Sequence, residues 1–150
     1  MTPKKLDDES IQSKLKMMQR LLRQLNSMGV FDRERLRQNL ADQLIAERVL
    51  SALVDLAAAV NTHVAVALLD EAPHDLQASF RLAAQAGLID QDLADKLAPS
   101  IGLRNVLIHG YMDLDIDRLI QAISIALDQY GQYVEQVARW LLQRQRESDA

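Results

Sequence analysis

A thirty-residue stretch, 40–69, is apolar on nearly every side, and it constrains the fold more than any other feature of the chain. A few polar side chains interrupt it at intervals of three, four and seven residues, a spacing that places them on one stripe of a helix: Arg48, Ser51, Asp55 and Thr62. We therefore expect a long helix that is covered by its own domain and by a further partner. Such a helix favours a dimer mediated by helices.

The most hydrophobic part of this stretch, 49–69, is about as long as a membrane span. It contains Asp55 and the polar trio 61–63 (Asn-Thr-His), however, and these side chains would be costly in hydrocarbon. We interpret it as the core helix of a globular domain with no membrane contact. Residues 1–10 lack the apolar segment of a signal peptide, and the chain has no cysteine, so we expect a cytoplasmic protein.

The rest of the chain is also typical of helices, because only five Gly and three Pro interrupt it and no run alternates apolar and polar residues. We expect an all-α fold in a single domain, 1–150: a helical bundle of about five helices. The expected helices begin at residue 7 or 8, at the N-cap Asp32, after the 73–75 turn, near Asp90, and at the acidic residues 113–117. Their expected ends are Ser27, about Asp70, Ala86, a break or kink near Pro99, and about Arg144, with fraying from about residue 145.

The charge is unevenly distributed along the chain. The net charge is −4, which argues mildly against a general nucleic-acid-binding protein. Residues 1–40 nevertheless carry nine Lys and Arg against five Asp and Glu, whereas residues 41–150 carry eight against sixteen. The basic N-terminal helix could attract phosphates, and solvated helix faces are the plainer explanation.

Metal-binding patterns are weak. The acidic triplet Asp113, Asp115 and Asp117 resembles the start of a calcium loop, but the glycine and the later glutamate of such a loop are missing. We interpret the triplet as complementing a helix dipole, and we expect no metal and no cofactor. His63 is expected to be a buried, hydrogen-bonded structural residue, and His74 an exposed residue without a role.

One octet, residues 104–111 (RNVLIHGY), gathers an arginine, a histidine and a tyrosine. Arg104 can hold a phosphate, His109 can transfer a proton near neutral pH, and Tyr111 offers a hydroxyl that can be modified. On an ideal helix Arg104 and His109, five residues apart, would diverge by about 140°. They converge on one ligand only if the helix is distorted, if the side chains wrap, or if a second subunit completes the site, and we favour the last. The plainer interpretation is a structural histidine, an ion-paired arginine and a tyrosine that caps the core.

The spacing Arg104-x4-His109-x-Tyr111 resembles the signature of the HepT-like toxin ribonucleases in the HEPN superfamily. The flanking sequence is similar as well, and it comprises 46–50 (AERVL) with Asp55 and 61–63 (NTH), then 80–89 (FRLAAQAGLI) and 93–96. The resemblance covers roughly residues 40–135.

This resemblance implies a HEPN-type bundle that forms a homodimer, with two Arg/His pairs lining a shared cleft. It also implies an endoribonuclease toxin of a type VII-like toxin–antitoxin pair. Cleavage would be metal-independent, with the RNA 2′-hydroxyl attacking the adjacent phosphate. His109 would act as general acid or base, Arg104 would clamp the phosphate, and Asn105 would orient the histidine or the phosphate.

The resemblance implies a regulatory role for Tyr111, not a catalytic one. In this family the partner antitoxin, a minimal nucleotidyltransferase (MntA-like), attaches AMP to the tyrosine of the motif. Added phosphates beside Arg104 and His109 would repel RNA. The alternative is a non-catalytic HEPN helical module that binds a nucleotidyltransferase or a nucleotide, and replacing His109 with alanine discriminates between the two.

Overall fold

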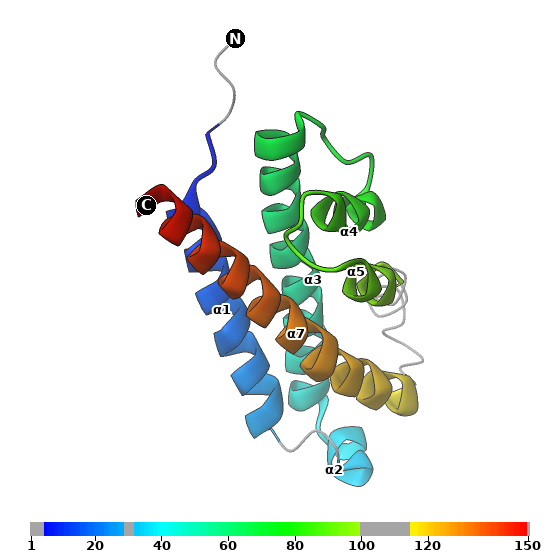
Figure 1. Cartoon of the computed structure of the whole chain (residues 1–150). Coiled ribbons are helices and arrows are strands. Elements are labelled where there is room, and N and C mark those ends of the chain that lie inside the picture. The colour runs from blue at the N-terminus through cyan, green and yellow to red at the C-terminus, as the bar shows by residue number, and fades with distance from the viewer. Residues whose placement is uncertain (1–4, 29–31, 100–114, 150) are drawn as a thin grey trace.

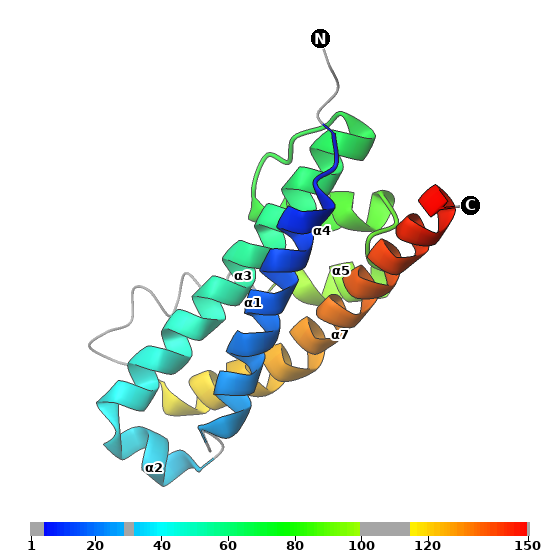
Figure 2. The same cartoon turned by 90° about the vertical axis from the view of Figure 1, so that its left-hand side faces the viewer.

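The structure is a computed structural model that describes residues 5–28, 32–99 and 115–149. Within these ranges the chain forms no strand and six helices: α1 (Asp8–Ser27), α2 (Arg33–Gln38), α3 (Leu40–Leu69), α4 (Leu76–Gln85), α5 (Gln91–Leu97) and α7 (Ile116–Asp149). The all-α expectation is confirmed. The long helices α1, α3 and α7 pack against one another, α4 and α5 cover one side of this bundle, and α2 lies at one end (Figures 1 and 2).

An aspartate or asparagine side chain begins every described helix. The side-chain oxygen accepts a hydrogen bond from a backbone N–H in the first turn, over 2.7 to 3.3 Å, at Asp7, Asp32, Asn39, Asp75, Asp90 and Asp115. Such a cap satisfies one of the N–H groups that have no partner within the helix, and it stabilises the helix by about 1 kcal/mol. The helix starts that we expected from sequence are confirmed where the structure describes them.

The expected single helix from Asp32 to Asp70 is wrong, because Asn39 divides it. Asn39 ends α2 and is the N-cap of α3, with an extended backbone at φ −118° and ψ 95°. The side-chain amide of Gln43 reaches back and donates to the carbonyls of Leu36 and Arg37, at 2.8 and 3.2 Å. The last carbonyls of α2 are therefore satisfied without proline or glycine.

The other helix ends agree with the sequence, except for the last. Gly87 follows α4 with φ +83°, and the amide of Leu88 donates to the carbonyl of Ala83 at 3.0 Å, which is a glycine-dependent helix end. Helix α5 stops at Leu97, two residues before Pro99. Helix α7 runs to Asp149 rather than to about Arg144, so the expected fraying from about residue 145 is not what the structure shows.

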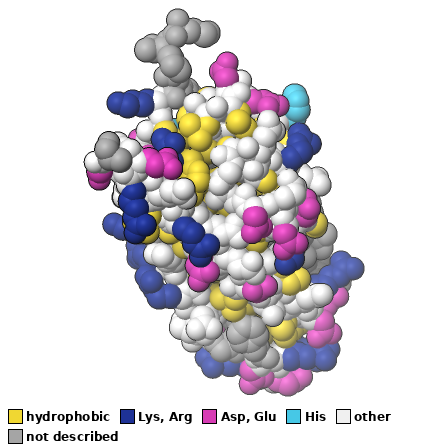
Figure 3. Space-filling model, viewed as in Figure 1, with side chains coloured by type: hydrophobic (Ala, Val, Ile, Leu, Met, Phe, Trp, Pro, Cys, Tyr) yellow, Lys and Arg dark blue, Asp and Glu magenta, His cyan; other side chains and the backbone are white. Residues whose placement is uncertain are grey.

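Packing contacts anchor α7 as far as about Arg144. The part of the helix near its C-terminus lies against α1, and Leu141 is only 3% exposed. The guanidinium of Arg144 lies over the ring of Trp140, 4.9 Å from its centre. The surface that α1 and α7 share on this face carries many charged side chains, with small apolar areas between them (Figure 3).

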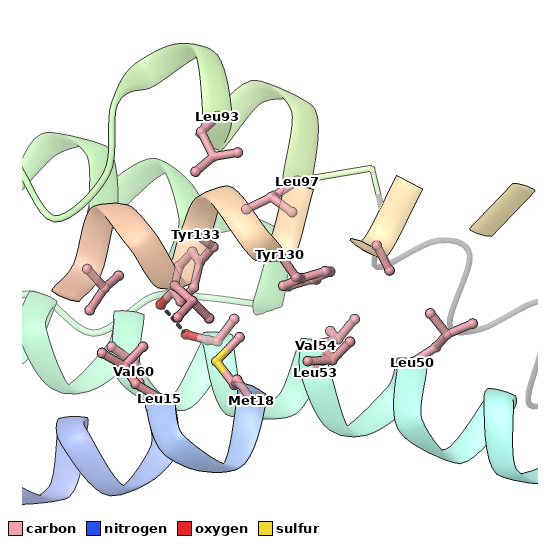
Figure 4. Packing of buried hydrophobic residues seen from close by; sticks show 14 of the residues in the cluster. Leu15, Met18, Leu50, Leu53, Val54, Val60, Leu93, Leu97, Tyr130 and Tyr133 are labelled. Atoms are coloured by element: carbon pink, nitrogen blue, oxygen red, sulfur yellow. Dashed lines mark hydrogen bonds between the residues drawn. The ribbon is translucent and has the colours of Figure 1, made fainter. Parts of the chain in front are cut away.

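The core lies where α1, α3, α5 and α7 meet. Figure 4 shows Leu15 and Met18 of α1 close to α3, while Tyr130 and Tyr133 of α7 lie between α3 and the leucines of α5. Helix α3 is long and apolar enough to span a membrane by length and composition, and 44% of its most apolar window is buried inside the structure. Leu53, Val60 and Val64 of this helix are fully buried in the core cluster, as expected for a core helix.

Candidate functional site

The residues that we expected to form the site, Arg104, Asn105, His109 and Tyr111, lie outside the described residues, as does Asp113. The structure describes the framework on both sides of the motif. Helix α5 ends at Leu97 before it, and α7 begins at Ile116 after it.

The helix before the motif is attached to α7 by a reciprocal pair of hydrogen bonds. The amide of Asp90 donates to Oε1 of Gln136 at 2.8 Å, and Nε2 of Gln136 donates back to Oδ2 of Asp90 at 2.9 Å. Asp90 is also the N-cap of α5. Because Leu93 and Leu97 of this helix are buried in the core, the chain reaches the motif from a fixed position.

The start of α7 is attached to α2. Oδ1 of Asp115 accepts hydrogen bonds from the amides of Asp117 and Arg118, at 3.0 and 3.3 Å. Asp117 forms an ion pair with Arg33, with 3.0 Å between Nη2 and Oδ2. These contacts confirm the helix-start interpretation for Asp115. Within the described ranges, no group of three or more His, Asp or Glu side chains is arranged to hold a metal ion.

A buried polar network links the helices α3, α4 and α7. The hydroxyl of Tyr133 donates to Oδ1 of Asn61 at 2.7 Å and lies 3.2 Å from the carbonyl oxygen of Ala57. Nδ2 of Asn61 donates to Oγ of Ser79 at 3.4 Å, and that hydroxyl donates to the carbonyl of Leu76 at 2.6 Å. Burial raises the pKa of Tyr133 well above the ordinary tyrosine value, and the neighbouring Tyr130 contributes to the rise.

The sequence indicates that Asn61 would be costly in a membrane span, but it indicates no partner for this side chain. An amide in a helix as apolar as α3 needs a hydrogen-bond partner if it is buried. This requirement predicts that Asn61 has a hydrogen-bond partner. It does not identify that partner as Tyr133, which lies 72 residues away in the sequence. The network holds α3, α4 and α7 in one arrangement and has a structural role.

The two histidines within the described residues do not form a catalytic pair. Nε2 of His63 accepts the backbone N–H of Asp7 at 2.9 Å, which ties the start of α1 to α3. This hydrogen bond supports the structural role expected for His63, although its side chain is only partly buried. His74 is exposed, as expected, and lines a groove of about 390 Å³ between α4 and α5 together with Arg81 and Asp95.

A second groove, of about 450 Å³, lies on the outer face of α3. Asp55, Thr62 and His63 line it, together with Val66 of the same helix and Leu76 at the start of α4. The polar stripe expected along α3 is therefore present in part, with Arg48 and Asp55 exposed and Thr62 half-buried. Ser51 departs from the expectation, since it is only 8% exposed.

The chain is similar in sequence to known ribonucleases. The family model described as "Ribonuclease HepT-like" matches residues 11–137, a range that includes the octet. A tRNA nuclease HepT from Aphanizomenon flos-aquae is 31% identical over 139 residues, which covers 93% of this chain and 95% of that protein. An mRNA nuclease HepT from Shewanella oneidensis is 30% identical over 89 residues, which covers 59% of this chain and 64% of that protein.

Solved structures have the same fold. A tri-AMPylated Shewanella oneidensis HEPN toxin in complex with MNT antitoxin matches with a TM-score of 0.77 and 23% identity, over 87% of this chain and 97% of that chain. YutE, a cytosolic protein of unknown function from Bacillus subtilis, matches with a TM-score of 0.78 and 14% identity, over 93% of each chain. The described helices therefore form a HEPN-like fold, and the family match extends over most of the sequence. The chain belongs to the ribonuclease HepT-like family.

Proposed function

We propose that this protein is an endoribonuclease toxin of a toxin–antitoxin pair and that it acts in the cytoplasm. The observation that carries the proposal is the family match over residues 11–137, which includes the Arg104-x4-His109-x-Tyr111 spacing. The relatives named as tRNA and mRNA nucleases support the same activity. Their names differ in the class of RNA, so both classes belong in the test.

The proposed reaction is a transesterification that uses no metal ion. His109 removes the proton from the RNA 2′-hydroxyl or donates one to the departing 5′-oxygen. The 2′-oxygen bonds to phosphorus and the bond to the 5′-oxygen breaks, which leaves a 2′,3′-cyclic phosphate and a 5′-hydroxyl. Arg104 stabilises the negative charge on the phosphate oxygens, and Asn105 orients the histidine or the phosphate.

The proposed site is shared between two copies of the chain. On an ideal helix Arg104 and His109 diverge by about 140° and cannot face the same ligand. A second subunit is therefore the simplest source of the other half of the site. Helix α3 offers apolar surface for such a contact, because large side chains near its start are exposed: Leu40 at 66%, Leu44 at 45% and Ile45 at 40%. We assign the homodimer interface to this end of α3.

Tyr111 is the proposed site of control. A partner nucleotidyltransferase transfers AMP from ATP to the tyrosine hydroxyl, and pyrophosphate leaves. Each added AMP places negative charge and bulk within a few residues of Arg104 and His109, which opposes binding of RNA. The likeness to a tri-AMPylated toxin bound to its antitoxin supports this proposal.

The nuclease test measures cleavage of purified tRNA and mRNA in the presence of EDTA. We expect products with 2′,3′-cyclic phosphate ends, and we expect His109→Ala and Arg104→Ala each to lower the rate by about a hundredfold or more. His74→Ala and Arg81→Ala are matched controls on α4 and its preceding turn, and they should cleave like the parent. Equal cleavage by the parent and by His109→Ala would leave the non-catalytic helical module as the better explanation.

The test of regulation through Tyr111 measures the intact mass of the protein. Co-expression with the partner nucleotidyltransferase should add a whole number of AMP units on a peptide that contains Tyr111, and Tyr111→Phe should remove the addition. An unmodified Tyr111 in an active complex, or modification that persists in Tyr111→Phe, contradicts the proposed role.

A further inference from the structure

The basic N-terminal region becomes a defined surface in the structure. Between Glu9 and Asp32 the sequence contains four Lys and Arg residues and no Asp or Glu. Three of the four follow one another at spacings of four and three residues along α1, so they lie on one stripe of the helix: Lys16, Arg20 and Arg23. All three are exposed. We call these three residues the α1 cationic stripe.

The cations of this stripe are not neutralised by the protein. None of the three makes an ion pair or a side-chain hydrogen bond within the described part of the chain. Elsewhere the exposed cations Arg33, Arg37, Lys96 and Arg118 each lie 3.0 to 3.8 Å from a carboxylate. Other exposed arginines, such as Arg48 and Arg139, also form no ion pair among the described residues, but the stripe gathers three such charges on one face of a single helix.

The fold gives no reason for this arrangement. Like charges three and four residues apart on a helix repel each other and destabilise it slightly. Cations can stabilise the last turn of a helix through its dipole, but the last turn of α1 contains no basic residue. Figure 3 shows Lys and Arg side chains gathered along the edge where α1 and α7 lie. A ligand that supplies negative charge explains the stripe better than helix stability does.

The spacing fits a polyphosphate backbone. Seven residues of an α-helix span about 10 Å. One strand of a nucleic-acid duplex carries a phosphate about every 3.4 Å, so this length faces about three phosphates. We propose that the α1 cationic stripe holds the phosphate backbone of the RNA substrate and positions it for cleavage. This inference rests on the proposed ribonuclease function, which requires RNA to bind but does not say where.

The location of the stripe suits such a role. Helix α1 packs along α7, and α7 begins five residues after Tyr111 in the sequence. The Arg33–Asp117 ion pair links the residues that follow α1 to the first turn of α7. RNA held on α1 therefore lies on the helix pair that leads to the motif. Contacts to phosphate position the RNA without reading its sequence.

The test compares neutralised variants of the full chain. In a His109→Ala background, which keeps the RNA intact, K16Q/R20Q/R23Q should bind a fluorescent tRNA about tenfold or more weakly at 0.1 M salt. The slope of log affinity against log salt should become shallower by about two to three. The matched control R37Q/R81Q/K96Q removes the same charge from α2, α4 and α5 and should bind like the parent. K16R/R20K/R23K keeps the charge and should also bind like the parent.

Cleavage kinetics separate positioning from folding. With His109 intact, K16Q/R20Q/R23Q should raise KM for RNA and leave kcat within about twofold, with an unchanged melting temperature. Unchanged affinity and salt slope in this variant overturn the stripe proposal while leaving the nuclease proposal standing. Weakened binding of the partner nucleotidyltransferase with normal RNA binding also overturns it, and assigns the stripe to an acidic protein surface. A parent chain that neither binds nor cleaves RNA refutes the proposed function itself.

Discussion

Asn61 lies in the most apolar helix of the protein, where an amide without a partner would be costly. The structure satisfies it twice, through the hydroxyl of Tyr133 and the hydroxyl of Ser79, and all three side chains are at most 1% exposed. The ring of Tyr133 also packs edge-on against Phe80, with 6.4 Å between the ring centres. At the scale of single residues, this network is the clearest example of a polar group that specifies how helices pair.

Tyr133→Phe tests the network. The variant keeps the ring but removes the hydroxyl that donates to Asn61, which leaves a buried acceptor with fewer partners. We expect a loss of about 1 to 3 kcal/mol in the free energy of unfolding, measured by urea denaturation. His74→Ala, at an exposed side chain, should have no effect. Coincident unfolding curves for Tyr133→Phe and the parent contradict the assigned role.

The same residue makes a prediction for alkaline pH. Because burial raises the pKa of Tyr133 in the folded state, the unfolded chain loses this proton first as the pH rises. The contribution of Tyr133 to stability is therefore complete below about pH 10, the ordinary tyrosine pKa, and is lost as the pH rises from there toward the folded-state pKa. The parent should lose more unfolding free energy than Tyr133→Phe above about pH 10. Parallel losses in the two proteins argue against a buried, neutral Tyr133.

At the scale of elements, the division between α2 and α3 depends on one side chain with two functions. Asn39 terminates α2 and caps α3, and Gln43 satisfies the carbonyls that α2 leaves open. Burial of Leu36, which is 1% exposed, holds the short helix against the core. A helix of six residues would not be stable on its own, so these contacts decide that it forms.

Asn39→Ala removes the cap and should lower the free energy of unfolding by about 0.5 to 2 kcal/mol. Asn39→Asp retains an acceptor for the amide of Asp42 and should cost little. Thermal or urea unfolding followed by circular dichroism measures both. An alanine variant as stable as the aspartate variant would show that the side chain of Asn39 does not decide the break.

At the scale of the whole molecule, the proposed homodimer requires an apolar surface that the bundle does not cover. The start of α3 offers one at Leu40, Leu44 and Ile45. L44D/I45D places two charges on this surface without disturbing the core. We expect a dimeric parent and a monomeric variant in analytical ultracentrifugation, and loss of RNA cleavage together with the dimer.

Leu142→Asp is the matched control, because Leu142 is 55% exposed and lies near the other end of the molecule, close to the C-terminus of α7. It should remain dimeric and active. A variant L44D/I45D that stays dimeric would move the interface away from the start of α3. A monomeric L44D/I45D with full activity would contradict a site shared between subunits.

Local chemistry explains what the sequence determined by itself. The all-α class, five capping aspartates, the end of α4 at Gly87 and the end of α5 before Pro99 depend on residues within one or two turns of each other. The candidate site residues Arg104, Asn105, His109 and Tyr111 also come from spacing and family resemblance, and they stay predictions because they lie outside the described residues. The family itself is confirmed over residues 11–137.

The tertiary structure alone decided the rest, because those features depend on groups that meet only when the chain has folded. Asn61 and Tyr133 are 72 residues apart, and Asp90 and Gln136 are 46 apart, so no local pattern pairs them. Packing against α1 anchors the C-terminal part of α7, where Leu141 is 3% exposed. The α1 cationic stripe depends on both the sequence and the tertiary structure. Its spacing is visible in the sequence, but only the fold shows that all three side chains are exposed and form no ion pair among the described residues.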